Sequence, residues 1–451
     1  MKCRSIRYGL REGSLTWMVS LLGATLLQVS ACSASGSDVA VGARDLEDGA
    51  APRAEVDGSA AIDSGGFDGG VEDILVRCTR RPCVTQVSAR GGSHVCALLD
   101  DHSVRCWGGN EAGQLGIGDG DGGSVSQYEA APRLVRNIAN AASVSAAGSG
   151  SSGATCILVD SGAVACFGSN RSGLLGTDFA MPTSSRPEPA FIPTFQATSI
   201  ALGATFAMAV GADGRLWSWG ANDTLQLARI PAEAGAISMA PAPADRVAVS
   251  VRSYAGTAGN GFAVTDNGEL LSWGAGTIAQ LGRSTSLTND PFPSAIGLSG
   301  VSKVATGASH ACALSNGEVH CWGANNHGQL GTTSRGNETT PARAILPADA
   351  VPVVLEAGGD NTCIITTNGG LYCWGANGGG QLGVSPGIDQ PTATGIRLGR
   401  KAAGVAIMEG AICALLRDGT VECLGDNARG QLGRGERDPL LHPEPAQVVF
   451  E

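Results

Sequence analysis

The chain is poor in aromatic residues, which occupy 4% of its 451 positions, and it has no excess of basic ones. Its formal net charge of −11 is unsuited to nucleic acid, because proteins that bind polyanions carry clustered cations. It has no catalytic constellation and no cofactor motif, so the sequence does not indicate an enzyme. Glycine is abundant, at 67 residues, which favours many tight turns over one large aromatic core.

An apolar run lies near the N-terminus, over residues 15–29, and follows a basic stretch that includes Arg4 and Arg7. A run of this length is too short to span a bilayer comfortably and is typical of an export signal. It ends in Val-Ser-Ala-Cys, which resembles the bacterial lipobox. We therefore expect residues 1–31 to be a lipoprotein signal peptide and Cys32 to be lipidated. A plain signal peptide cleaved nearby is the alternative.

Residues 32–73 form a predicted linker. Ten acidic residues and only two arginines lie between Ser33 and Asp73, with much Gly, Ala and Ser. Such a segment cannot bury enough apolar surface to fold, so we expect a solvated tether. Without residues 1–31 the chain has 26 basic and 40 acidic residues, a formal charge of −14.

A nine-residue motif of the form Gly-Ala-Asn-x-x-Gly-Gln-Leu-Gly recurs seven times, and we call each copy a tail. The tails cover residues 108–116, 168–176, 220–228, 274–282, 323–331, 375–383 and 425–433. The residues that precede them are Trp107, Phe167, Trp219, Trp273, Trp322, Trp374 and Leu424. A period near fifty residues, with a hairpin in each unit, predicts a β-propeller or a related closed array.

A predicted β-hairpin precedes each tail and is clearest at residues 310–322. There Asn316-Gly317 separates two alternating runs, and both residues tolerate the positive φ of a two-residue turn. Five other hairpins have three-residue turns that end in glycine, while the first has His102 at that position. A further apolar run before each hairpin gives about four strands per unit. We expect the terminal run, residues 445–450, to complete the first blade and close the ring.

The string G-x-x-H-x-C-A-L, followed by G-x-V-x-C-W-G-x-N-x-x-G-Q-L-G, resembles the repeat of the regulator of chromosome condensation family. The resemblance runs from residue 83 to residue 451 and implies an all-β fold, a seven-bladed β-propeller over residues 74–451. Guanine-nucleotide exchange is known in this family. Predicted export would separate this chain from cytosolic GTPases, however, and no residues match an exchange site.

Ten of the fourteen cysteines face each other in pairs across five hairpins. The register puts each pair at a non-hydrogen-bonded position, where side chains approach closely enough for a disulfide. The predicted pairs are Cys96 with Cys106, Cys156 with Cys166, Cys312 with Cys321, Cys363 with Cys373, and Cys413 with Cys423. Blades three and four lose both cysteines together, which favours disulfides, and Cys78 and Cys83 are candidates for a sixth. Zinc is disfavoured, because a hairpin pair supplies only two ligands and only Cys78 and Cys83 are closely spaced.

The remaining polar candidates have structural interpretations. His94 and His310 share one repeat position, where other blades have Ala, Phe or Asn, so we expect a structural role at the start of a strand. The loop from Asp119 to Asp121 could bind calcium, and the sequence leaves this open. The repeated tryptophans recur at one register per blade, so we expect them to pack in the blades rather than to form a light-sensing or stacking cluster.

Long irregular connections, such as residues 117–131, 177–198 and 229–245, are where binding is expected on a rigid frame. The leading hypothesis is a scaffold anchored in the cell envelope, at the outer membrane or cell surface. It would bind a protein or glycan through inter-blade loops and contact the membrane through its lipid anchor only. One alternative is a secreted inhibitor of a periplasmic or extracellular enzyme. Another is a carbohydrate-active enzyme, which would need two carboxylates converging at one mouth of the ring.

Overall fold

Every regular element of the described chain is a β-strand. The computed structural model describes residues 74–79, 81–118, 126–177, 185–229, 235 and 237–450. The predicted signal peptide, Cys32 and the predicted linker therefore lie outside the described residues, as does the loop from Asp119 to Asp121. The described residues contain 27 strands and belong to one compact unit, residues 62–451.

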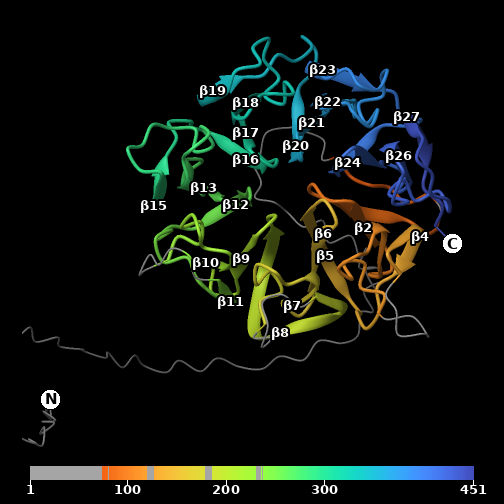
Figure 1. Cartoon of the computed structure of the whole chain (residues 1–451), viewed down its shortest axis with the longest axis horizontal. Helices are drawn as coiled ribbons and strands as arrows, with labels where there is room; N and C mark the ends of the chain where they lie inside the picture. Colours follow the sequence, from red (N-terminus) through yellow and green to blue (C-terminus); the bar gives the residue numbers. More distant parts are fainter. Residues whose placement is uncertain are drawn as a thin grey trace, which may run out of the picture. The chain divides into compact units, whose positions relative to one another are not determined.

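Groups of four antiparallel strands form seven blades around a common centre, with the first strand of each blade innermost (Figure 1). The first three blades comprise β1 (Val84–Ser88), β2 (His94–Leu99), β3 (Val104–Gly109) and β4 (Tyr128–Leu134); β5 (Ala141–Ser149), β6 (Ser152–Val159), β7 (Ala163–Ser169) and the first part of β8 (Ser185–Leu202); and the last part of β8 with β9 (Phe206–Gly211), β10 (Leu216–Gly220) and β11 (Ser238–Pro243). The other four comprise β12 (Val251–Gly256), β13 (Asn260–Thr265), β14 (Leu270–Ala275) and β15 (Asn289–Ala295); β16 (Val301–Thr306), β17 (His310–Ser315), β18 (Glu318–Gly323) and β19 (Glu338–Arg343); β20 (Pro352–Gly358), β21 (Asn361–Thr366), β22 (Leu371–Gly375) and β23 (Gln390–Ile396); and β24 (Ala402–Ile407), β25 (Ala411–Leu416), β26 (Val421–Asp426) and β27 (Leu441–Gln447).

Strand β8 belongs to two blades, which is why blades two and three share one seven-stranded sheet. As far as Gln196 it pairs with β7, as the outer strand of blade two. From Ala197 onward it pairs with β9, as the inner strand of blade three. The chain thus passes from rim to centre without a break in strand structure.

The hairpin at the middle of each blade has the predicted register. In blade five Ser315 pairs with Glu318 and Cys312 with Cys321, and the turn residues Asn316 and Gly317 have φ of 50° and 79°. The glycines that end the five three-residue turns have φ between 76° and 84°, and His102 has φ of 62°. Turn chemistry thus sets the register from which the cysteine pairing follows.

The hydrophobic core is divided among the seven seams between adjacent blades. Seven clusters of buried side chains each combine residues from two neighbouring blades. The cluster between blades seven and one includes Val95, Trp107, Val421 and Leu432, so the ring is closed by packing as at every other seam. This confirms the seven-bladed all-β propeller.

The pairing of the C-terminal strand differs from the prediction. Strand β27 pairs with β26 as the outer strand of blade seven, and Glu422 lies opposite Gln447. Blade one already has four strands of its own, so it has no vacant position for a C-terminal strand. The chain end still contributes to closure, because Val448 is buried in this seam and the Phe450 ring lies edge-on, 5.8 Å from the Trp107 ring.

Candidate interaction surface

The two ends of the blades form two different faces. Because the strands of a blade are antiparallel, the connections after its first and third strands lie at one end, and those after its second and fourth lie at the other. The first end carries the seven tails, and we call it the tail face. The second end carries the hairpin turns, and we call it the turn face.

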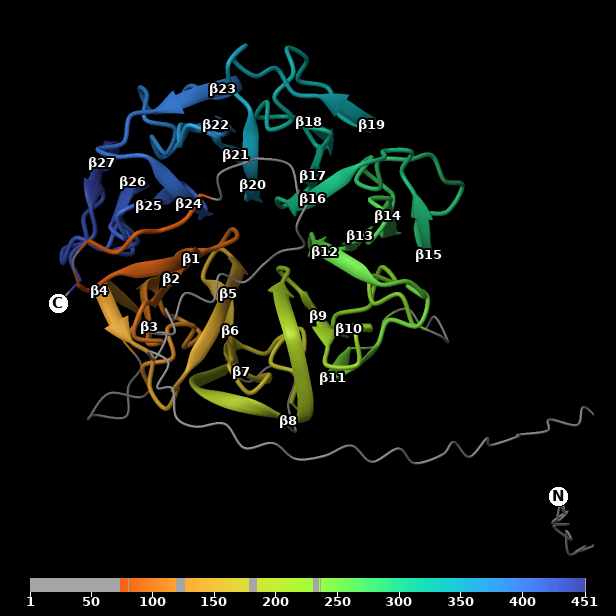
Figure 2. The same cartoon turned by 180° about the vertical axis from the view of Figure 1, so that it is seen from behind.

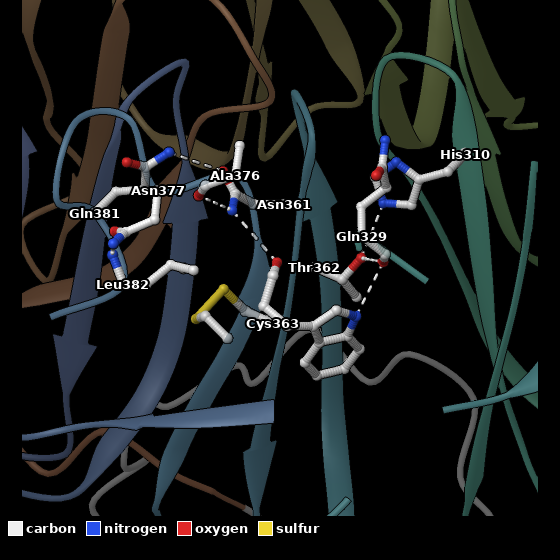
Figure 3. The surroundings of a disulfide bond; sticks show 11 residues. His310, Gln329, Asn361, Thr362, Cys363, Ala376, Asn377, Gln381 and Leu382 are labelled. Carbon is white, nitrogen blue, oxygen red and sulfur yellow. Dashed lines mark hydrogen bonds between the residues drawn. A yellow bond between two sulfur atoms is a disulfide. The ribbon is translucent and has the colours of Figure 1, made fainter. Parts of the chain in front are cut away.

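Each tail is a hydrogen-bonded turn that fixes the start of the following connection. In blade six, Asn377 Oδ1 accepts a hydrogen bond from the Leu382 amide at 3.1 Å (Figure 3). Gln381 Oε1 accepts one from the Gly379 amide at 2.9 Å. The same Asn-to-Leu bond recurs in the tails of blades one, two, three, five and seven. The repeated Asn, Gln and Leu are therefore used by the fold.

The repeated tryptophans join adjacent blades. Trp374 Nε1 donates to the carbonyl oxygen of Gln329 in the preceding tail at 2.9 Å. Trp219, Trp273 and Trp322 make the corresponding bond to the blade before them. Trp107 donates to Gln431 of blade seven at 3.1 Å, so the ring-closing seam has the same bond.

The two buried histidines extend this seam network. His310 Nε2 lies 2.8 Å from Thr362 Oγ1, which donates to the Gln329 carbonyl at 2.9 Å (Figure 3). Because the threonine hydroxyl uses its hydrogen there, it accepts from a neutral imidazole protonated at Nε2. His94 makes the same contact with Thr155 in the neighbouring blade. Burial lowers the pKa of both histidines to about 4, which supports a structural role.

The five facing cysteine pairs are disulfides in the structure, each with a Cα–Cα distance of 4.0 to 4.1 Å. All ten cysteines are fully buried, and the pairing is the predicted one: Cys96 is bonded to Cys106, Cys156 to Cys166, Cys312 to Cys321, Cys363 to Cys373, and Cys413 to Cys423. Cys78 and Cys83 form a sixth disulfide, in which Cys78 is exposed and Cys83 is buried beside Gly419 of blade seven. Six disulfides are typical of a protein in an oxidising extracellular or envelope compartment.

The two blades without a hairpin disulfide have a polar network that the sequence analysis missed. Met208 and Phe262 are buried opposite Ser218 and Ser272, as expected for packing in place of a disulfide. In blade four, Ser272 Oγ also donates to the Leu281 carbonyl at 2.8 Å and accepts from Arg283 Nε at 3.0 Å. Ser218 and Arg229 make the corresponding contacts in blade three. The sequence feature that accompanies this network is an arginine directly after the tail in both blades.

A cluster of charged side chains on the tail face joins blades five and six. His327 Nδ1 lies 2.9 Å from Asp389 Oδ2, and its Nε2 lies 3.9 Å from Asp360 Oδ2. Burial acts in the opposite direction, but hydrogen bonds from His327 and the Asn377 amide lower the pKa of Asp389. A glycosidase acid needs a raised pKa, so this pair of carboxylates does not support carbohydrate chemistry.

Exposed aliphatic side chains are a second feature of the tail face. They follow the tails or lie within them in blades three, four, six and seven, and each has at least 40% of its surface exposed: Ile237, Ile278, Leu287, Ile388 and Leu440.

Within the described ranges there is no group of three or more His, Cys, Asp or Glu residues that could hold a metal ion. The same ranges contain no helix long and apolar enough to cross a membrane.

Comparison with known proteins supports the repeat assignment. The regulator of chromosome condensation (RCC1) repeat matches residues 84–114, 301–329 and 354–381 in one form and residues 267–314 and 316–365 in another. The mitochondrial RCC1 domain-containing protein RUG3 of Arabidopsis thaliana is 30% identical over 235 residues, half of each chain. The ultraviolet-B receptor UVR8 of the same plant is 26% identical over 378 residues, 79% of this chain and 80% of the receptor.

Solved structures show the same architecture. Prp20p from Saccharomyces cerevisiae has a TM-score of 0.66 at 21% sequence identity, over 77% of this chain and 86% of that protein. At this identity the likeness establishes the fold alone. The repeat matches, seven tails and seven blade seams therefore show that the chain is a β-propeller that contains RCC1 repeats, an architecture suited to an interaction scaffold.

Proposed function

We propose that this chain is an exported, lipid-anchored interaction scaffold that binds a protein partner through its tail face. The observation that carries the proposal is the set of exposed aliphatic side chains on that face, from Ile237 to Leu440. Burial of such groups stabilises protein–protein contacts, since apolar area removed from water contributes about 25 cal/mol per Å². Exposed aliphatic side chains also lie on the turn face, at Val249, Ile345 and Val351, but those of the tail face lie within the tails or in the connections that directly follow them.

The frame beneath these side chains is rigid. Asn and Gln hydrogen bonds fix the tail turns, and Trp bonds fix neighbouring blades relative to each other. Side chains held in place before binding lose little conformational freedom when they bind. The similar propeller Prp20p has binding properties toward Gsp1p and histones, so protein partners have a precedent among similar folds. A protein partner is therefore favoured over a glycan.

Export and anchoring rest on the sequence pattern that ends at Cys32, and the six disulfides fit an oxidising compartment. On this basis the partner is sought among exported or envelope proteins. A cytosolic GTPase lies in a reducing compartment, where disulfides are rare. Guanine-nucleotide exchange on such a GTPase is therefore disfavoured for a chain with six disulfides.

Site-specific photocrosslinking in intact cells tests the proposal. A photoreactive amino acid at Ile388 or Leu440 should crosslink to one protein, and the same residue at Val351 on the turn face should not. Val351 is a matched control because it is an aliphatic residue of similar exposure, 52%. Replacing Ile388 and Leu440 with Glu should abolish recovery of that protein, whereas Val351→Glu should not. Crosslinks only from Val351, or none from either face, would refute the proposal.

A further inference from the structure

The turn face of blade seven carries a group of basic residues in a chain whose net charge is negative. We call Arg77, Arg397, Arg400, Lys401 and Arg417 the basic patch. Arg77, Arg397 and Lys401 are exposed, and none of the three has a side-chain ion pair or hydrogen bond with another described residue. Charges left exposed and unpaired in this way are available to an external partner.

Backbone contacts show that three separate segments form this patch. The Arg77 amide donates to the Arg417 carbonyl at 2.6 Å, and the Arg417 amide donates to the Lys401 carbonyl at 2.9 Å. Arg397 and Arg400 belong to the connection that leads to Lys401. Figure 2 shows the first described segment, coloured red-orange, running alongside β24 of blade seven.

The patch keeps an excess of positive charge after its local pairs are counted. Arg400 Nε lies 3.0 Å from Asp418 Oδ2, and that carboxylate is 8% exposed. Glu422 accepts a hydrogen bond from the Gly399 amide at 3.0 Å and is partly buried. Five cations thus share two carboxylates, both of which are used by neighbouring groups. Leu75, 48% exposed, adds an apolar side chain two residues before Arg77.

We propose that the basic patch binds an anionic phospholipid surface. The proposal rests on the proposed envelope anchoring, because the predicted tether, residues 32–73, ends directly before Ile74. A coil of 42 residues has a root-mean-square span of about 35 Å, so an anchor at Cys32 would hold the patch near the bilayer. Lys and Arg bind phosphate headgroups, and each contributes about fivefold to affinity for an anionic leaflet.

This second membrane contact would also set the orientation of the propeller. The sequence alone predicts membrane contact through the lipid only, and a single lipid tether leaves the direction of the ring undefined. The turn face and the tail face are at opposite ends of the blades. Docking of the basic patch would therefore point the tail face, with Ile388 and Leu440, away from the bilayer and toward a partner.

Vesicle flotation of the full chain carrying Cys32→Ser tests the proposal without the lipid anchor. Vesicles of phosphatidylcholine alone are compared with vesicles that contain 30% phosphatidylglycerol, and the difference between them is the measure. Replacing Arg397 and Lys401 with Gln should lower the phosphatidylglycerol-dependent binding about 25-fold, from about fivefold per cation. Replacing Arg171 and Arg215 with Gln is the matched control, because both are exposed and neither has a side-chain hydrogen bond or ion pair with a described residue.

Three outcomes would overturn the proposal. One is equal binding to both vesicle types, and another is an equal loss in the two double variants. The third is binding that appears only after Asp63, Asp68, Glu72 and Asp73 are replaced by Asn or Gln, which would assign the patch to the chain's own acidic residues. None of these outcomes depends on the crosslinks from the tail face, so each of the two proposals can be refuted without the other.

Discussion

The two buried histidines predict a loss of stability in mild acid. Each imidazole in the folded protein has its Nε2 bonded to a threonine hydroxyl, and its Nδ1 is buried with no partner in the described structure. A proton at Nδ1 would place a charge in a buried site, and only at His94 does a backbone group, that of Ala154, partly offset the burial. Burial accordingly lowers the pKa of His94 and His310 to about 4, whereas in the unfolded chain the pKa of histidine is about 6.5.

The sign and size of the effect follow from linkage. Between pH 6.5 and pH 4 the unfolded chain takes up a proton at each histidine and the folded protein does not, so stability falls as the pH falls. One pKa unit corresponds to about 1.4 kcal/mol, so each histidine costs about 2 kcal/mol at pH 5 and the pair about 4 kcal/mol. At pH 7 both histidines are neutral in the folded and the unfolded chain, so this cost is almost absent. Aspartates whose pKa is lowered, such as Asp438 at about 2, change the free energy of unfolding mainly below the pH range of the histidines.

Urea unfolding followed by tryptophan fluorescence at pH 7.0, 6.0 and 5.0 measures this slope. The double variant His94→Asn, His310→Asn should lose most of it, since Asn occupies the same repeat position in blades four and six. His442→Asn is the control for loss of a histidine elsewhere, because His442 bonds to Asp438 on blade seven and lies outside the buried positions of His94 and His310. An identical slope in the parent and the double variant would refute the reasoning.

Four further predictions follow from the seams, the blades and the anchor. Trp107→Phe removes the indole bond to Gln431 and should lower the free energy of unfolding by about 1 kcal/mol, measured by urea unfolding. Arg283→Met leaves the Asp290 carboxylate, 8% exposed, without its cation and should cost about 3 kcal/mol in the same assay. Reduction should accelerate hydrogen exchange first in the five disulfide hairpins, and equal acceleration in blades three and four would contradict this. Cys32→Ser should release the protein from membranes or leave its precursor uncleaved, and fractionation would show unchanged retention if acylation is wrong.

Most of the fold could be predicted because the repeat specifies it locally. Asn316-Gly317 fixes a two-residue turn, the turn fixes the strand register, and the register places Cys312 opposite Cys321. The same reasoning holds wherever a turn ends in glycine, as it does between Cys363 and Cys373. Each step uses residues within about ten positions of each other, so no long-range information was needed.

The pairing at the ring closure could not be obtained in this way. A run of strand residues follows each tail and another precedes each hairpin, so the boundary between repeats is ambiguous in the sequence. The run after the last tail was assigned to blade one, although it follows its tail as β4 and β19 follow theirs. If the strand after each tail is counted as part of the same blade, β27 belongs to blade seven. The structure shows this pairing, between β27 and β26.

The Ser–Arg networks and the basic patch were missed for a different reason. Arg283 lies eleven residues beyond Ser272, across the tail, and only the folded turn brings Arg283 Nε to 3.0 Å from Ser272 Oγ. The patch combines Arg77 with Lys401 and Arg417, which are more than 300 positions away along the chain. Closure of the ring brings them together, and the repeat pattern contains no information about charges placed outside it.

The division between repeated and unrepeated residues locates function in this propeller. The repeated Asn and Gln hold the tail turns, the repeated Trp joins neighbouring blades, and the paired Cys cross-link the hairpins, so these side chains are already used by the fold. A partner that recognised them would find the same features in most blades and could not select one position on the ring. The exposed aliphatic groups of the tail face and the basic patch of blade seven occur instead at positions that differ between blades. They break the sevenfold symmetry, and only such features can give the ring one binding site and one orientation.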